Sequence, residues 1–477
     1  MSAKSGPFKT FAEMLSDMAD RCPESTAILT TEYGEQVKIT YNELYQRVME
    51  LASRYKREDC TCVGIYANAS AMWIITMFAA VIAGKRTVLF DVLFPPERLI
   101  ELVRVCGVDS LYATNSEGKQ IFGGYMNDLR TEDIKEYGAI HEAMANRMSV
   151  NPDEEIEEGG KLLFFTSGTT DFYKAVVLSQ QSLLYDAWVG QQIAHGTPED
   201  TVLCMLPMWH VFGFVTGILW PLSIGAHVAL SRGIRHALQD PITFEPDYIP
   251  VIPSLLKYML SMDALNKNLG TIIIGGSPCD EATFEMLFKR GIRVMHGYGL
   301  TETSSGIACS TDPRNIYAMY PCEGSEFKIA KDGEIMVRTP SIMDGYFRDP
   351  GSTAAKVVDG WLMTGDLGHI DSEGRLIVLG KKDEVLVLSN GEKLFCPEIE
   401  GELNAMIGTE TELYLEDDRL TLAVVARNKT REEIEKQVEL FNKKQSVSKR
   451  IEKISVREKP LPRTVGGDLQ RWRVSET

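Results

Sequence analysis

The sequence predicts an α/β protein with more than one domain. In the first third of the chain and again in its middle, short β-rich runs alternate with segments of helical periodicity, the βαβ pattern of a parallel sheet. From about Gly324, short alternating runs separated by "KDG" and "SEG" turns predict antiparallel hairpins and therefore a different subdomain. The chain has 477 residues. Since a single core rarely grows beyond roughly 250–300 residues, two or more domains are expected.

Six segments of the first third carry the clearest signals, namely 11–22, 41–58 and 94–107 for helices and 62–67, 86–91 and 108–114 for strands. In the last helix, prolines mark the start and Gly107 marks the end. The longest apolar stretch, 71–84, is shorter than the roughly 20 residues that span a bilayer, so we interpret it as a buried helix. Residues 115–160 are polar and acidic, and we expect a loop-rich connection there.

The middle of the chain repeats the pattern, and a new unit follows the charged segment "GKKDE" at 380–384. Residues 271–299 predict a strand, a glycine turn, a helix and a second strand. Beyond 384 the predicted order is a hairpin, a helix, a strand and a helix, at 384–395, 396–406, 420–426 and 431–444. This α+β block of about 95 residues is long enough to bury its own core, and "GKKDE" is a plausible linker or hinge.

The composition narrows the class of protein. A net charge of -17 argues against a general nucleic-acid surface, because basic patches supply that affinity. The nine cysteines are scattered without a metal-binding spacing, which favours reduced thiols in a reducing compartment. The N-terminal "MSAKSGPFKTFAEM" lacks the apolar core of a signal peptide. We therefore expect a cytoplasmic protein without a membrane anchor.

A hydroxyl-rich loop after a buried strand is the first candidate site. The run "LLFF" leads directly into Thr166 to Thr170, "TSGTT", and Lys174 follows. Hydroxyls, a flexible glycine and a cation suit phosphate oxygens. The pattern is not a P-loop, which needs a second glycine before the lysine and Ser or Thr after it. The alternative interpretation is a Ser/Thr-rich surface turn.

Two further segments have the right residues for a nucleotide. In "MHGYGLTETSSG" a strand leads into a glycine turn, where Tyr298 could stack on a flat base and Glu302 is a hard oxygen ligand suited to Mg²⁺. The alternative is a strand-end turn followed by a capped helix. In "GWLMTGDLGHID", Asp366 follows a glycine in what we expect to be a turn and could accept from two ribose hydroxyls. The alternative is a turn aspartate without a ligand.

Taken together and in this order, these segments resemble the adenylate-forming superfamily, which contains acyl- and aryl-CoA synthetases, amino-acid adenylation domains and luciferases. The resemblance covers nearly the whole chain. It is carried by "ITYNEL", "FTSGTTDFYKAV", "LPMWHVFG", "GGSP", "HGYGLTET", "TGDLGHID", "GKKDEVLVLSNGEKLFCPEIE" and the terminal "LPRTVGGDLQR".

The resemblance implies an architecture and a reaction. An N-terminal AMP-binding domain, 1–382, would combine mixed sheets and helices with a distorted β-barrel-like subdomain. A small mobile C-terminal domain, 383–477, would follow a hinge near Asp383. A small carboxylic acid and MgATP would give acyl-AMP and pyrophosphate, and a thiol would then take the acyl group and release AMP. The implied cofactors are ATP, Mg²⁺ and CoA, or the phosphopantetheine of a carrier protein.

The resemblance also assigns roles by matching position. The β- and γ-phosphates would be held by Thr166, Ser167, Gly168, Thr169, Thr170 and Lys174. The nucleotide would further contact Gly276, Ser277, Pro278, Gly297, Tyr298 and Gly299, with Asp366 and Lys381 at the ribose. Thr301 would contact the α-phosphate, Glu302 would hold Mg²⁺, His210 would line the acyl pocket, and Gly391 would lie along the thiol channel. For His210 the alternative is a structural histidine.

The chain departs from the family pattern at three places. In the phosphate loop Asp171 stands for the usual Gly, Tyr173 for Pro and Ala175 for Gly. Lys381 replaces the usual Arg before the hinge, so a point charge replaces a bidentate fork. The third departure is the adenylation lysine, whose position is occupied by Asp468.

The change at Asp468 bears directly on the first reaction step. Reversing one charge changes a Coulomb energy of roughly 4 kcal/mol per pair at 4 Å and an effective dielectric of 20. Three hypotheses remain open: a CoA ligase in which an engineered or natural change impairs adenylation, a non-catalytic nucleotide- or acyl-binding relative, and a ligase that loads a carrier protein. The segment "HVFGF" lacks the aspartate of amino-acid adenylation domains, which favours an acid with an uncharged tail or ring.

Overall fold

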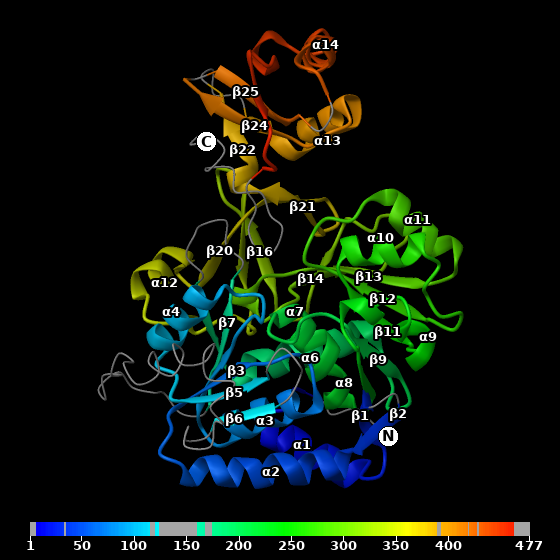
Figure 1. Cartoon of the computed structure of the whole chain (residues 1–477), viewed down its shortest axis with the longest axis vertical. Coiled ribbons are helices and arrows are strands. Elements are labelled where there is room, and N and C mark those ends of the chain that lie inside the picture. Colours follow the sequence, from blue (N-terminus) through cyan, green and yellow to red (C-terminus); the bar gives the residue numbers. More distant parts are fainter. Residues whose placement is uncertain are drawn as a thin grey trace.

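The computed structural model describes residues 6–32, 35–114, 120–123, 160–166, 174–388, 393–417, 419–426 and 429–461 (Figure 1). Two large sheets and a smaller antiparallel sheet form the body of the molecule, and the last part of the chain forms a separate unit at one end (Figure 1). The predicted α/β class with hairpins after Gly324 is therefore confirmed.

The first large sheet has nine strands in the order β15-β14-β13-β12-β11-β9-β10-β1-β2. Its strands are β1 Thr26–Glu32, β2 Glu35–Thr40, β9 Thr201–Cys204, β10 His227–Leu230, β11 Tyr248–Val251, β12 Thr271–Ile274, β13 Arg293–Tyr298, β14 Ala308–Ser310 and β15 Tyr320–Pro321. From β1 to β13 neighbouring strands are parallel, and antiparallel strands close both edges. Runs such as "TIII" in β12 are buried throughout because helices cover both faces of a parallel sheet.

The second large sheet has seven strands in the order β18-β8-β7-β4-β3-β5-β6. Its strands are β3 Cys62–Tyr66, β4 Arg86–Leu89, β5 Ser110–Thr114, β6 Gln120–Gly123, β7 Leu162–Phe165, β8 Ala175–Leu178 and β18 Gly345–Tyr346. Strand β6 pairs antiparallel with β5. The loop-rich connection predicted over 115–160 lies mostly outside the described residues, and its described part at 120–123 pairs with the edge strand β5.

Helices pack on and between the two sheets (Figure 1). They are α1 Phe11–Arg21, α2 Tyr41–Arg57, α3 Ala71–Ile82, α4 Pro96–Cys106, α6 Gln180–Ala194, α7 Val211–Phe214, α8 Trp220–Ile224, α9 Asp240–Phe244, α10 Pro253–Ser261, α11 Glu281–Lys289 and α12 Pro350–Lys356. The largest core cluster includes Phe11, Trp73, Phe164 and Phe214, so it joins α1 and α3 to β7 and α7. The apolar α3 is buried, as predicted, and none of the described helices is long and apolar enough to cross a membrane.

Local capping explains where several helices begin. Thr40 and Glu43 form a reciprocal capping box at the start of α2, and Ser70 accepts the backbone N–H of Trp73 at the start of α3. Helix α4 ends at Gly107, whose φ of 65° is left-handed. These ends agree with the boundaries that the sequence predicts.

The third sheet contains β16 Glu326–Ile329, β17 Glu334–Arg338, β19 Val357–Val358, β20 Trp361–Ile370 and β21 Leu376–Lys381. Asp366 lies inside β20 and not in a turn, which corrects the sequence prediction. Gly365 has a φ of 82°, and the pairing of β20 with β17 shifts register across this region. A Gly-Asp pair marks a turn or a bulge equally well, because both need a left-handed residue.

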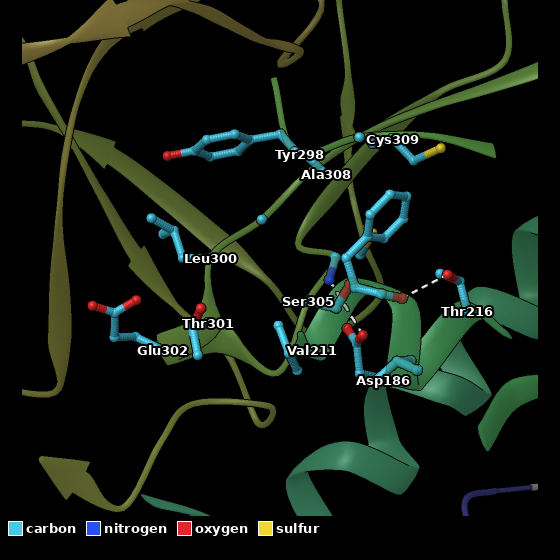
Figure 2. Close-up of a pocket in the computed structure, with 18 of the residues that line it drawn as sticks. Asp186, Val211, Thr216, Tyr298, Leu300, Thr301, Glu302, Ser305, Ala308 and Cys309 are labelled. Atoms are coloured by element: carbon cyan, nitrogen blue, oxygen red, sulfur yellow. Dashed lines mark hydrogen bonds between the residues drawn. The ribbon is translucent and has the colours of Figure 1, made fainter. Parts of the chain in front are cut away.

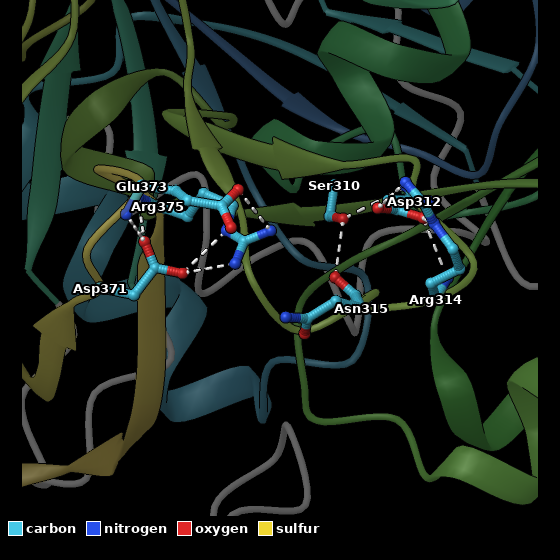
Figure 3. A network of polar contacts seen from close by, with 7 residues as sticks. All are labelled: Ser310, Asp312, Arg314, Asn315, Asp371, Glu373 and Arg375. Atoms are coloured by element: carbon cyan, nitrogen blue, oxygen red, sulfur yellow. Dashed lines mark hydrogen bonds and ion pairs between the residues drawn. The ribbon is translucent and has the colours of Figure 1, made fainter.

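Figure 3 shows two polar networks that fix loops beside this sheet. In the "SEG" turn, Asp371 accepts hydrogen bonds from the backbone N–H of Glu373 and from both the backbone and the side chain of Arg375. After β14, Asp312 accepts from the backbone and guanidinium of Arg314. The same device, an aspartate that accepts local N–H groups, sets both turns.

The C-terminal unit has sheets and a core of its own. It contains β22 Val385–Val387, β23 Lys393–Phe395, α13 Cys396–Ile407, β24 Thr411–Glu416, β25 Arg419–Val425, α14 Arg431–Asn442 and β26 Lys453–Arg457. Its core cluster includes Leu403, Leu422, Ile434 and Phe441. All the buried residues of this cluster that the structure describes lie between Leu388 and Ile451. The domain boundary at Lys382 and Asp383, and the mobility of the unit, stay predictions.

We expect Phe441→Ala to destabilise this C-terminal unit selectively. The ring is fully buried in the cluster, and truncating a buried Phe costs about 3–5 kcal/mol. Hydrogen–deuterium exchange should show faster exchange across 393–461 and little change in the two large sheets. The matched variant Phe284→Ala, in the core under α11, should act on the nine-stranded sheet instead. Equal loss of protection everywhere in both variants would contradict independent cores.

Candidate active site

A cavity of about 780 Å³ opens where the two large sheets meet the third sheet. The predicted site residues that line it are Thr166, Lys174, His210, Gly276, Gly297, Tyr298, Gly299, Thr301, Glu302, Asp366, Lys381 and Asp383. They come from the carboxyl ends of strands β7 and β13, from the loop after β12, and from β20 and β21. Carboxyl ends of parallel strands are where α/β proteins bind ligands.

Some predicted residues are not part of this lining. Ser277 and Pro278 are exposed and lie outside the cavity lining, although their neighbour Gly276 belongs to it. Ser167, Gly168, Thr169, Thr170, Gly391 and Asp468 lie outside the described residues. Both ends of the hydroxyl-rich loop are described, and the backbone N–H of Thr166 donates to the carbonyl of Lys174 at 3.1 Å.

Tyr298 and Asp366 form a short buried hydrogen bond. The Tyr298 hydroxyl donates to Oδ2 of Asp366 at 2.6 Å. Burial raises the pKa of Asp366, while the hydrogen bond from Tyr298 and the charge of Lys381, its cross-strand neighbour, oppose that rise. Burial, reinforced by the adjacent carboxylate, also raises the pKa of Tyr298 well above its usual value. The hydrogen bond from Tyr298 therefore fixes the Asp366 carboxylate in one position at the cavity wall.

Glu302 forms the second such pair. Its Oε1 accepts from the Tyr346 hydroxyl at 2.6 Å, and the side chain is only 7% exposed. Burial, followed by the charge of Glu302, raises the pKa of Tyr346. Lys174 lies over the Tyr346 ring at 4.7 Å and donates to the Ser352 hydroxyl at 3.1 Å. A carboxylate and a cation thus share one tyrosine at the edge of the cavity.

The other lysines of the cavity are also held in place. Lys356 donates to the carbonyl of Thr364 at 3.0 Å. Lys382 bridges Asp332 at 2.6 Å and Glu334 at 2.8 Å. Around Asp366, the positive charges of Lys381 and Lys356 act against the negative charge of Asp383.

Gly299 allows two segments of backbone to approach closely. A Cβ at this position would collide with the carbonyl of Ser305. The following residues are constrained as well, because Ser304 and Ser305 have φ angles of 61° and 129°. In contrast, a Cβ on Gly297 would meet only ordinary contacts at 3.8 Å and beyond. The loop shape after β13 thus depends on Gly299.

His210 stands at the N-terminus of α7 with an acidic neighbour. Its Nε2 lies 3.6 Å from Oδ2 of Asp91, which follows β4 and is nearly buried. Burial disfavours the charged form of Asp91, but hydrogen bonds from His210 and from the Leu93 N–H outweigh it and lower the pKa of Asp91. This contact orients the imidazole at the cavity wall.

The residues that line the far part of the cavity were not predicted from the sequence. Its lining includes Asp186, Val189, Gly190, Ile193, Val215, Thr216, Cys309 and Cys322. Several of these residues lie at helical spacing on one face of α6, from Asp186 to Ile193. The aspartate within the apolar helical segment 183–189 was the signal available for this wall. Figure 2 shows Asp186 and Thr216 on the opposite side of the view from Glu302.

The comparisons with known proteins agree with this arrangement. The family model described as "AMP-binding enzyme" matches residues 15–347. The chain belongs to the AMP-binding enzyme family. The family resemblance found in the sequence is thereby confirmed, as is the enzyme class, because the curated relatives are acid–thiol ligases.

Two curated relatives indicate the range of the family. The chain is 30% identical over 335 residues to the 2-succinylbenzoate–CoA ligase of Listeria monocytogenes serotype 4b (strain F2365), covering 66% of this chain and 69% of that protein. It is 29% identical over 421 residues to the indoleacetate–CoA ligase of Aromatoleum aromaticum (strain DSM 19018 / LMG 30748 / EbN1), covering 81% of this chain and 82% of that protein.

A solved structure supports the fold. The o-succinylbenzoate CoA synthetase (MenE) from Bacillus subtilis, in complex with the acyl-adenylate intermediate OSB-AMP, superimposes with a TM-score of 0.80 at 21% identity. The match covers 97% of this chain and 98% of that chain. The two-domain fold is therefore shared over nearly the full length.

We expect Gly299→Ala to damage the site while Gly297→Ala is tolerated. The added methyl group collides with backbone in the first variant and has room in the second. Overpacking of this kind costs about 1–3 kcal/mol. Thermal unfolding checks both effects: the Tm should fall for Gly299→Ala and stay unchanged for Gly297→Ala. Equal behaviour of the two variants would contradict the close approach.

Proposed function

We propose that the chain joins a small acyl or aryl carboxylic acid to the thiol of CoA, through an acyl-adenylate formed from ATP. The observation that carries this proposal is the cavity itself. At one end it combines Asp366, Glu302 and Lys174, and at the other end it is mostly apolar. A charged nucleotide and an uncharged acyl group need such a divided site.

The donor set fits Mg²⁺. Glu302 is a buried carboxylate at the cavity wall, with one oxygen held by Tyr346. No cluster of three or more His, Cys, Asp or Glu suited to a metal is found among the described residues. Mg²⁺ typically takes one or two carboxylates together with substrate phosphates. When bound, the ion would offset phosphate charge as the anionic substrates approach each other.

In the first step, a carboxylate oxygen of the acid bonds to the α-phosphorus of ATP, and the bond to pyrophosphate breaks. We assign Lys174 and the Thr166 loop to the β- and γ-phosphates and Thr301 to the α-phosphate. Asp366 accepts the ribose hydroxyls, and Tyr298, Gly276 and Gly297 frame the base. Positioned cations lower the repulsion between two anions.

In the second step, the CoA sulfur bonds to the acyl carbon, AMP leaves, and the thiol proton passes to solvent. Rotation of the C-terminal unit at Asp383 would precede this step, with Gly391 beside the incoming thiol. Lys382 supports this assignment, because its bridges to Asp332 and Glu334 fix the chain up to the residue before Asp383. A carrier-protein phosphopantetheine in place of CoA remains an outcome to be tested.

A second candidate function rests on Asp468. The position aligned with the adenylation lysine is acidic, and losing a few kcal/mol of transition-state stabilisation slows a reaction by on the order of a hundredfold. A chain that binds nucleotide and acid without efficient catalysis would have the same cavity. The ligase and the non-catalytic protein differ in one expected result, because a lysine at position 468 should restore adenylation only in the ligase.

We expect Asp468→Lys to raise ATP–pyrophosphate exchange by on the order of a hundredfold above a wild-type rate near background. Charge reversal at the exposed Glu458, by Glu458→Lys, is the matched control and should leave exchange unchanged. Preformed acyl-AMP with CoA tests the second step alone. If Asp468→Lys stays inert over a broad panel of acids, the non-catalytic candidate is favoured.

We expect Tyr298→Phe to shift the pH dependence of AMP affinity. The ionised form of Asp366 accepts both ribose hydroxyls, so affinity should fall as the pH drops through its pKa. The Tyr298 hydrogen bond lowers that pKa, so its removal should move the loss of affinity to higher pH. Calorimetric titration of AMP between pH 5 and pH 8 checks the direction. If the pH midpoint of AMP affinity is the same in the wild type and in Tyr298→Phe, Asp366 does not bind the ribose in its ionised form.

A further inference from the structure

Asp186 is a buried carboxyl group on the wall of the far part of the cavity. It lies on α6 and is only 6% exposed. Within the described part of the chain it accepts one hydrogen bond, from the Gly306 N–H to Oδ2 at 3.2 Å, and forms no ion pair. Burial raises its pKa well above the usual value, and the Gly306 N–H only partly opposes this.

An aspartate is a costly choice if its task is only to hold the Gly306 loop. One N–H satisfies one oxygen, and burying an unpaired carboxyl costs several kcal/mol. Asn at the same position would accept the same hydrogen bond without the charge. The second oxygen therefore needs another partner, and the cavity that Asp186 lines is where that partner can lie.

Among the described residues, no cation pairs with that oxygen. The cavity lysines Lys174, Lys356 and Lys382 contact Ser352, Thr364 and the pair Asp332 and Glu334, respectively. The fourth cavity lysine, Lys381, stands opposite Asp366 in the β20–β21 pairing and acts on its charge. The thiols of Cys309 and Cys322 are neutral, because burial raises the pKa of Cys309 to about 12 and that of Cys322 well above its usual value. The Thr216 hydroxyl donates to the Phe212 carbonyl at 2.6 Å.

Gly190 keeps space open one turn along the same helix. It lines the cavity, and a Cβ added there would meet no atom within 4 Å. A glycine inside a helix costs roughly 0.5–1 kcal/mol relative to Ala. The helix thus gives up stability at the position four residues after Asp186, on the same face.

We propose that Asp186 is a specificity determinant, which selects carboxylic acids that carry a neutral hydrogen-bond donor, an aryl amino or hydroxyl group, on the part remote from the reacting carboxylate. This inference rests on the proposed function of the cavity. The donor group bonds to the Asp186 oxygen that Gly306 leaves unpaired, and the space beside Gly190 admits the ring. This bond stabilises the ionised carboxylate, so the bound acid opposes the rise in the pKa of Asp186 that burial causes. A neutral donor satisfies the carboxyl group without bringing a second charge into an apolar pocket.

The test compares aminobenzoates with the corresponding methoxybenzoates, which accept but do not donate, in all three ring positions. Acid binding is measured by calorimetry with AMP present, and thioester formation is measured in parallel. At the best ring position the wild type should bind the aminobenzoate about tenfold or more tightly than the methoxybenzoate. This is the ratio expected for one hydrogen bond worth about 1.4 kcal/mol.

Asp186→Asn is the decisive variant. Its amide oxygen can still accept the hydrogen bond from the Gly306 N–H. The amide N–H₂ then points toward the ligand, so a donor replaces the acceptor of the wild type. The amino-to-methoxy ratio should therefore fall by about tenfold or invert. Ser182→Ala is the matched control, since Ser182 lies buried on the same helix and bonds to Ser179 rather than lining the cavity. This control should keep the wild-type ratio.

Gly190→Val is the second variant, and it tests the inference even if Asp186→Asn does not fold. It should weaken the substituted benzoates at the best ring position relative to benzoate itself. A wild-type preference for the methoxy acids, no preference in binding, or an unchanged ratio in Asp186→Asn overturns the inference. Asp186-dependent binding without any adenylate or thioester, even in the Asp468→Lys variant, would instead refute the proposed catalytic function and leave the inference standing.

Discussion

Two tyrosine–carboxylate hydrogen bonds hold the three sheets of the N-terminal part together around the cavity. Tyr298, at the end of β13 in the nine-stranded sheet, bonds to Asp366 in β20 of the third sheet. Tyr346, in β18 of the seven-stranded sheet, bonds to Glu302 just after β13. Hydrogen bonds to charged groups contribute about 1.5–3 kcal/mol each and lose more when one partner is removed. The same contacts that join the sheets therefore fix the carboxylates that face the cavity.

The constraint extends from these pairs to the charges around them. Buried carboxylates require nearby positive charge or donors, and Lys381 stands opposite Asp366 in the β20–β21 pairing. Glu334 accepts both from Lys382 and from the Gly365 N–H at 2.9 Å, so the bulge that presents Asp366 is tied to the end of β21. These contacts hold the end of the third sheet up to Lys382, the residue before the proposed hinge at Asp383.

Two aspartates give this member of the family its particular character. Asp468 puts a negative charge where the family pattern has a cation, and Asp186 puts a carboxyl group in an otherwise largely apolar wall. In our proposals the first lowers the rate of adenylate formation and the second selects the acid.

The sequence by itself determined the α/β class, most element boundaries and the family, because periodicity, caps and collinear motifs are local signals. It also indicated Glu302, Asp366 and Lys174 as site residues, through motifs of a few residues each. Only the tertiary structure decided that Asp366 sits at a bulge and that Tyr346 is the partner of Glu302. It also revealed Asp186 and Gly190, because the far wall of the cavity is assembled from α6, the π-helical turn Val215–Leu219 and β14. Such a surface depends on packing between segments far apart in the chain, which no local pattern encodes.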